Sequence, residues 1–111
     1  MGLVNSGLIE LDPRTVKAML DAGEAVLVDV REEEEFAEEH IAGSVLQPMS
    51  DFELETWPTF EGRKAIISCL GGVRSAAIAN KLINSGQGWA IHMKGGLNAW
   101  KDAGLETIRQ D

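Results

Sequence analysis

Apolar runs and stretches with helical spacing alternate along the whole chain. Runs typical of strands lie at residues 8–11, 25–30, 44–47, 65–68 and 89–93. Helical spacing or helix-start signals lie at residues 13–22, 33–39, 75–85 and 97–103. Short apolar runs favour buried strands, whereas apolar residues three and four apart favour helices. Strands that alternate with helices predict an α/β domain with a central, mostly parallel, five-stranded sheet and helices on both faces.

Proline and glycine mark several of the expected boundaries. Asp12 and Pro13 supply an N-cap and a proline at the first helical position, and Gly23 ends that helix. The pattern is weaker over residues 48–62, where Pro58 interrupts any long helix, so we expect loop and short helix there. We find no linker, repeat or low-complexity tract and predict one domain over residues 1–111.

The acidic composition narrows the range of partners. A net charge of -8 disfavours nucleic acid as a partner, since phosphate binding requires clustered lysine and arginine. No apolar stretch is long enough to cross a bilayer, so we expect no membrane partner. A single cysteine fits a reducing compartment, and we expect a cytoplasmic protein. Residues 1–6 match the loose N-myristoylation pattern, which we interpret as coincidence.

The single cysteine, Cys69, lies where the strand at 65–68 gives way to the next helix. Ligands in open α/β sheets bind beyond the carboxyl ends of central strands. Gly71 and Gly72 allow a tight loop whose N–H groups turn inward, and the helix start adds positive partial charge. With Arg74 nearby, this loop favours the thiolate, which is the nucleophilic form of sulfur. A small buried hydrophobic residue is the alternative interpretation of a lone cysteine.

Three separated motifs resemble those of the rhodanese family. The first, in residues 29–43, resembles the D-V-R, E-[FY] and G-H-I-P-G-[AS] block, with Glu39 and Ala42 in place of the usual glycine and proline. The second, in residues 69–75, resembles C-x-x-G-x-R-[ST], and the third, in residues 95–100, resembles G-G-x-x-x-W. The resemblance covers nearly the whole chain, and the three motifs keep the expected order.

The resemblance implies a three-layer rhodanese-like fold and a sulfurtransferase. In this family a cysteine takes a sulfane sulfur from a donor, holds it as a persulfide and passes it to a nucleophile, a role that falls here to Cys69. The donor would be thiosulfate or another small persulfide, with a protein as a possible donor or acceptor, and no cofactor is needed. We expect the transferred sulfur to be bound by backbone N–H groups of the following loop residues: Leu70, Gly71, Gly72, Val73 and Arg74.

Two other functions remain open at this point. Cysteine-dependent phosphatases and arsenate reductases place five residues between cysteine and arginine, whereas four separate Cys69 from Arg74. The other alternative is a non-catalytic sulfur carrier or protein-interaction module. Leu70 and Gly71 stand where family members that use thiosulfate often carry a basic residue, so we expect thiosulfate to be a poor donor.

The remaining polar residues of interest have mainly structural interpretations. Arg74 either orients an anionic donor or pairs with a nearby carboxylate. Asp29 and Arg31 are expected to brace the fold through buried hydrogen bonds. His40 and His92 have no partners at metal-ligand spacing, so we expect no metal site and a structural role for both histidines. At helical spacing from its neighbours, the Trp100 side chain is expected to fill the core, although it also belongs to the third motif.

Overall fold

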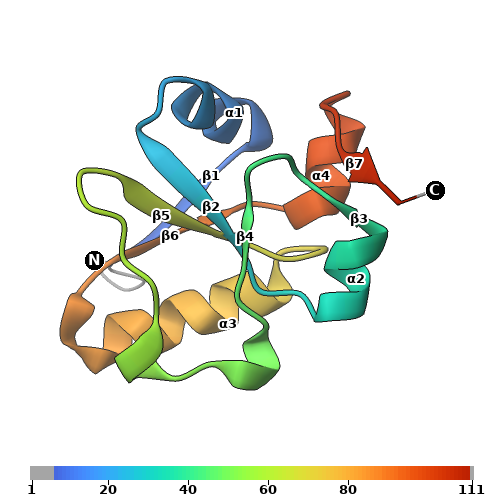
Figure 1. Cartoon of the computed structure of the whole chain (residues 1–111). Coiled ribbons are helices and arrows are strands. Elements are labelled where there is room, and N and C mark those ends of the chain that lie inside the picture. Colours follow the sequence, from blue (N-terminus) through green and yellow to red (C-terminus); the bar gives the residue numbers. More distant parts are fainter. Residues whose placement is uncertain (1–6, 111) are drawn as a thin grey trace.

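The computed structural model, which describes residues 7–110, has three layers with a parallel sheet in the middle (Figure 1). The sheet has the strand order β1-β6-β5-β2-β4, and every neighbouring pair is parallel. The five-stranded sheet expected from the sequence is therefore confirmed. The N-myristoylation pattern of residues 1–6 lies outside the described residues. The strands are β1 (Leu8–Leu11), β2 (Ala25–Asp29), β4 (Val45–Leu46), β5 (Lys64–Ser68) and β6 (Ala90–Met93).

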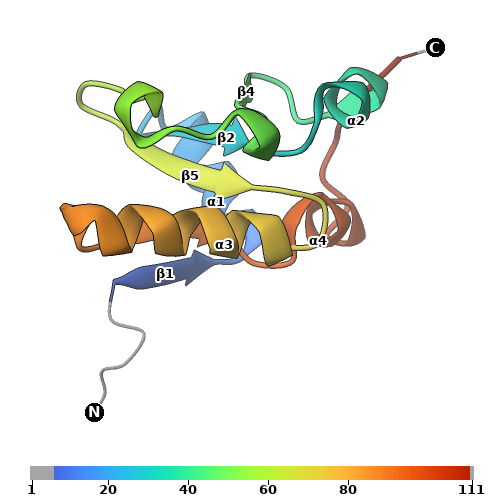
Figure 2. The same cartoon turned by 90° about the horizontal axis from the view of Figure 1, so that it is seen from below.

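Helices cover both faces of this sheet, as expected. One face carries α3 (Val73–Leu82), which lies in front of the sheet in Figure 2. The other face carries α1 (Pro13–Asp21) and α4 (Gly96–Asp102), which contact each other. The short α2 (Glu33–Glu38) lies beyond the carboxyl end of β2. Within the described residues, no helix has the length and apolar character needed to cross a membrane.

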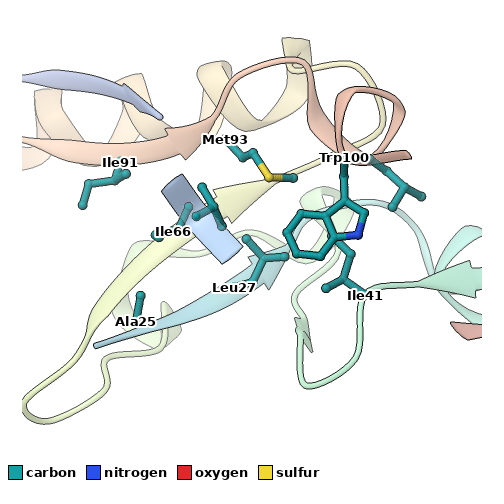
Figure 3. Close-up of a cluster of buried hydrophobic side chains, with 9 residues drawn as sticks. Ala25, Leu27, Ile41, Ile66, Ile91, Met93 and Trp100 are labelled. Carbon is teal, nitrogen blue, oxygen red and sulfur yellow. The ribbon is translucent and has the colours of Figure 1, made fainter. Parts of the chain in front are cut away.

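The core has two halves, one on each side of the sheet. Successive side chains of a strand point to opposite faces, so Ile66 of β5 packs under α1 and α4 whereas Ile67 packs under α3. Burial on both faces explains the continuous apolar run of β2, in which every residue is buried. Figure 3 shows the Trp100 ring among the apolar side chains of the first half, and its Nε1–H donates to the carbonyl of Glu106 at 2.9 Å. The expected core role of Trp100 is confirmed.

The structure differs from the expected elements in two places. Two-residue strands β3 (Glu39–His40) and β7 (Ile108–Arg109) form an antiparallel pair outside the main sheet. Strands this short show no readable period, so the sequence pattern does not reveal them. The helix expected over residues 75–85 begins earlier, at Val73, and ends at Leu82, where a π-helical turn continues the chain. Gly72 explains the early start because its left-handed φ of 101° lets the chain enter the helix directly after the loop.

Candidate active site

Cys69 follows the central strand β5 and lies at the carboxyl edge of the sheet, between the ends of β2 and β6. Its Sγ accepts hydrogen bonds from the backbone N–H of Gly72 at 3.1 Å and of Ser75 at 3.2 Å. The side chain is 1% exposed, and the two N–H groups lie in the loop and the first turn of α3. Two dipoles aimed at one sulfur stabilise negative charge on it, so the loop forms a small cradle for a thiolate.

The predicted cradle residues differ in what they contribute. Gly72 donates its N–H to the sulfur, and the second N–H comes from Ser75, one residue beyond the predicted set. The Leu70 and Val73 side chains are exposed at the mouth of the loop, by 39% and 80%. Gly71 has open space where a Cβ would lie. Ser75 is the last position of the C-x-x-G-x-R-[ST] motif, and this membership was the available signal for the second donor.

The start of α4 supports this loop from behind. The N–H groups of Leu97 and Asn98 donate to the carbonyls of Cys69 at 2.8 Å and Leu70 at 3.0 Å. Gly96 permits this approach because a Cβ there would collide with both carbonyl oxygens, and its φ of 60° also favours glycine. Gly96 of the third motif therefore allows α4 to hold the loop that follows Cys69.

Arg74 points to a carboxylate on α2. Its guanidinium bonds both oxygens of Glu35, at 2.8 and 3.1 Å. The hydrogen bonds from Arg74 are the main reason that the pKa of Glu35 is lowered to about 2, and the same pair raises the pKa of Arg74. This geometry matches the second interpretation of Arg74, as a partner for a nearby carboxylate. A direct role of Arg74 toward a donor stays a prediction.

We expect Glu35→Gln to weaken the acid sensitivity of folding. The folded-state pKa of Glu35 is about 2 and its ordinary value is 4.5. A carboxyl group whose pKa is lowered on folding stabilises the folded state at pH values above its unfolded-state pKa. This contribution is lost as the pH falls from about 5 to about 2. Urea titrations across this range should show a smaller drop in the free energy of unfolding for the variant than for wild type. Equal decreases in the free energy of unfolding would contradict the lowered pKa of Glu35 in the folded state.

Behind the sulfur lies a line of side chains that the sequence did not connect. The Ser75 hydroxyl is 3.5 Å from Cys69 Sγ and 2.8 Å from His92 Nδ1. The other ring nitrogen, Nε2, is 2.8 Å from Oε2 of Glu10, which pairs with His92 in the register of β1 and β6. His92 therefore contacts the loop that follows Cys69, in addition to the structural role that the sequence predicts for it. The sequence signal for this contact was the presence of one polar residue, His92, in the otherwise apolar run of β6.

The other singled-out polar residues brace the edge of the sheet. Arg31 bonds both carboxylate oxygens of Asp29 and donates to the carbonyl of Glu39 at 2.6 Å, and the Asp29 and Arg31 side chains are both buried. The His40 ring stacks on Phe36 with centroids 4.0 Å apart. Among residues 7–110, no three histidine, cysteine, aspartate or glutamate side chains are grouped so that they would hold a metal ion.

Comparison with known proteins identifies the family to which this fold belongs. The model of the Rhodanese-like domain family matches residues 12–103. An uncharacterized protein of Synechocystis is 35% identical over 91% of this chain, which spans only 56% of that relative. Thiosulfate sulfurtransferase GlpE of Haemophilus influenzae is 33% identical, with 86% of this chain and 90% of the relative aligned.

A solved structure extends the likeness to the backbone. A Rhodanese-like domain protein from Staphylococcus aureus is 33% identical and superposes with a TM-score of 0.70, over 94% of this chain and 99% of that one. The loop after β5 and the glycine pair at the start of α4 lie within the residues that the family model matches. The chain therefore belongs to the rhodanese-like domain family.

Proposed function

We propose that this chain is a sulfurtransferase that carries sulfur as a persulfide on Cys69. The observation that supports this most strongly is the pair of backbone N–H groups, from Gly72 and Ser75, that donate to a single cysteine sulfur. The family supplies the second support, because the relative from Haemophilus influenzae is named a thiosulfate sulfurtransferase. The loop backbone from Leu70 to Arg74 remains the proposed site for the transferred sulfur.

The proposed reaction has two displacement steps. The Cys69 thiolate attacks the outer sulfur of the donor, so a sulfur–sulfur bond forms while the donor's bond to that sulfur breaks and the leaving group takes the electron pair. An acceptor nucleophile then attacks the outer sulfur, and Cys69 departs as a thiolate. Negative charge lies on sulfur at each stage, where the N–H groups of the cradle stabilise it.

The mouth of the loop favours a persulfide over thiosulfate as the donor. Exposed Leu70 and Val73 give it an apolar character, and the Arg74 guanidinium is paired with Glu35. A small dianion would therefore find little free positive charge there, whereas a low-molecular-weight or protein persulfide can contact the apolar side chains. The same apolar mouth supports the second candidate function, a carrier that relays sulfur between proteins.

The Arg74–Glu35 pair also argues against phosphatase chemistry. Such an enzyme needs its arginine fork free for a tetrahedral oxyanion, and here Glu35 occupies the fork. The loop between Cys69 and Arg74 also has four residues, which suits a single sulfur better than a phosphoryl group. We therefore keep sulfur transfer as the proposed chemistry.

Intact-mass analysis tests the proposal without any variant, because Cys69 is the chain's single cysteine. Incubation with glutathione persulfide should add one sulfur atom, which dithiothreitol removes. Prior alkylation with iodoacetamide should block the gain. Thiosulfate should load less sulfur at equal concentration, and efficient thiosulfate:cyanide transfer at sub-millimolar donor would contradict the donor preference. No gain from glutathione persulfide, thiosulfate or mercaptopyruvate would contradict sulfur transfer and favour the interaction module.

A further inference from the structure

A buried histidine contacts the active loop from inside the domain. His92 is 2% exposed on β6, whose other residues, Ala90, Ile91 and Met93, are apolar and buried. A buried imidazole with both ring nitrogens hydrogen-bonded is held in one orientation and one tautomer. The two displacement steps of sulfur transfer do not use this group. Its contacts therefore call for a separate explanation.

The contacts of His92 form a continuous line from the sulfur to the surface. A carboxylate only accepts hydrogen bonds, so Glu10 assigns the proton of the neutral ring to Nε2 and leaves Nδ1 as an acceptor. The Ser75 hydroxyl, which also lies 3.2 Å from the carbonyl oxygen of Gly72, can then donate to Nδ1 at 2.8 Å and accept from the Cys69 thiol, whose Sγ is 3.5 Å away. The Glu10 side chain, at the far end, is 48% exposed. We call these four side chains the relay line.

We propose that His92, held by Glu10, takes up the Cys69 proton through Ser75 when the thiol becomes a thiolate. The S–H bond breaks and its electron pair stays on sulfur. Ser75 Oγ takes that proton while it passes its own to His92 Nδ1. The products are a thiolate, an imidazolium and an unchanged Glu10 carboxylate, so no oxidant or further reactant is needed.

The relay line provides a proton acceptor for a thiol that is buried away from bulk water. A thiol that is 1% exposed has little bulk water to receive its proton, and the relay line offers a receiver inside the protein. An imidazolium between the Glu10 carboxylate and the thiolate is compensated on both sides. His92 acts through Ser75 and does not touch the sulfur, so it is a positioning residue. The inference rests on the proposed function, for which it describes how the nucleophile forms.

Other charged groups near the relay line come from neighbouring elements. On the sulfur side, α3 contributes Arg74, α2 contributes Glu35 and the end of β2 contributes Asp29, and the first two form an ion pair. Asp29 is paired with Arg31. On the side of β1 the charged partner is Glu10, and Lys94 follows β6 one residue beyond its end. The titrating groups to be separated by experiment are therefore Cys69, His92 and Glu10.

The rate of Cys69 alkylation by iodoacetamide, measured from pH 5 to pH 10 on the full chain, tests the relay. His92→Asn keeps a polar atom for Ser75 but removes the proton receiver, so the midpoint of the profile should rise by about one pH unit, with alkylation at neutral pH about tenfold slower. Ser75→Ala should raise it similarly, and Glu10→Gln should raise it less. The matched control is His40→Asn, because His40 contacts Phe36 and lies outside the relay line. Profiles for His92→Asn and Ser75→Ala that superpose on wild type would overturn the proposal.

A second measurement leaves the histidine intact, in case its replacement unfolds the protein. Coupling between two titrating groups is reciprocal. Removal of the Cys69 thiolate must therefore shift the titration of His92 by as much as removal of the His92 imidazole shifts the titration of Cys69. In nuclear magnetic resonance spectra of Cys69→Ser, the His92 ring should titrate about one pH unit lower than in wild type, while the His40 ring is unchanged. An unchanged His92 titration would overturn the relay. Sulfur loading with superposed alkylation profiles would refute the relay alone, whereas shifted profiles without loading by any donor would refute the transferase function alone.

Discussion

Replacement of Cys69 by serine is expected to lower kcat/KM for sulfur transfer by about a thousandfold or more. A hydroxyl at this position is almost fully protonated and is a much weaker nucleophile than a thiolate, and it cannot hold a persulfide. The cradle itself should survive, because the N–H groups of Gly72 and Ser75 can donate to a serine oxygen as they do to the sulfur. Release of sulfide from glutathione persulfide in the presence of dithiothreitol, after subtraction of the rate without protein, measures the loss.

The free energy of unfolding separates loss of chemistry from loss of structure. Serine fills slightly less volume than cysteine and keeps hydrogen-bond partners, so the Cys69→Ser variant should stay within about 1 kcal/mol of wild type in urea titrations. Turnover that persists in a folded variant would contradict nucleophilic sulfur chemistry at this position. The reactive group would then have to come from a partner bound to the surface of the domain.

Local patterns predicted the fold well, and they also predicted that the loop with Cys69 joins a strand to a helix. The apolar run of β2 is readable because a parallel strand buried on both faces must be continuously apolar. The loop after β5 is readable because the chain passes there from a strand to a helix through two glycines beside a cysteine. Gly72 takes the left-handed conformation that its residue type suggests, with a φ of 101°.

Contacts between residues far apart in the sequence could not be predicted from local sequence patterns. Glu10 and His92 meet because β1 pairs with β6, a register that joins residues 82 positions apart. Arg74 and Glu35 are 39 positions apart, and α2 carries several glutamates of similar appearance, so the sequence pattern does not single out the partner. The electrostatic partners of the site are thus set by topology, whereas the position of Cys69, the proposed nucleophile, is set by local sequence.

Replacement of Arg31 by alanine is expected to lower the free energy of unfolding by about 3–5 kcal/mol. Both members of the Asp29–Arg31 pair are buried, and the guanidinium also donates to the carbonyl of Glu39. Its loss would leave the Asp29 carboxylate inside the protein with one remaining donor among residues 7–110, the N–H of residue 31, at 3.0 Å. Because a domain of this size has a stability of about 5–15 kcal/mol, urea titration followed by tryptophan fluorescence should show a clear loss.

The exposed pair Lys17–Asp21 on α1 provides the matched control. Its side chains are 42% and 62% exposed, so Lys17→Ala should change the stability by only about 0.5 kcal/mol. Similar losses in the two variants would contradict the special role of the buried pair. Removal of both buried charges, in Asp29→Asn with Arg31→Met, should recover part of the loss because no unpaired charge then remains inside. Such a recovery would show that the loss in Arg31→Ala comes mainly from the unpaired Asp29 carboxylate, and that the net contribution of the pair itself is smaller.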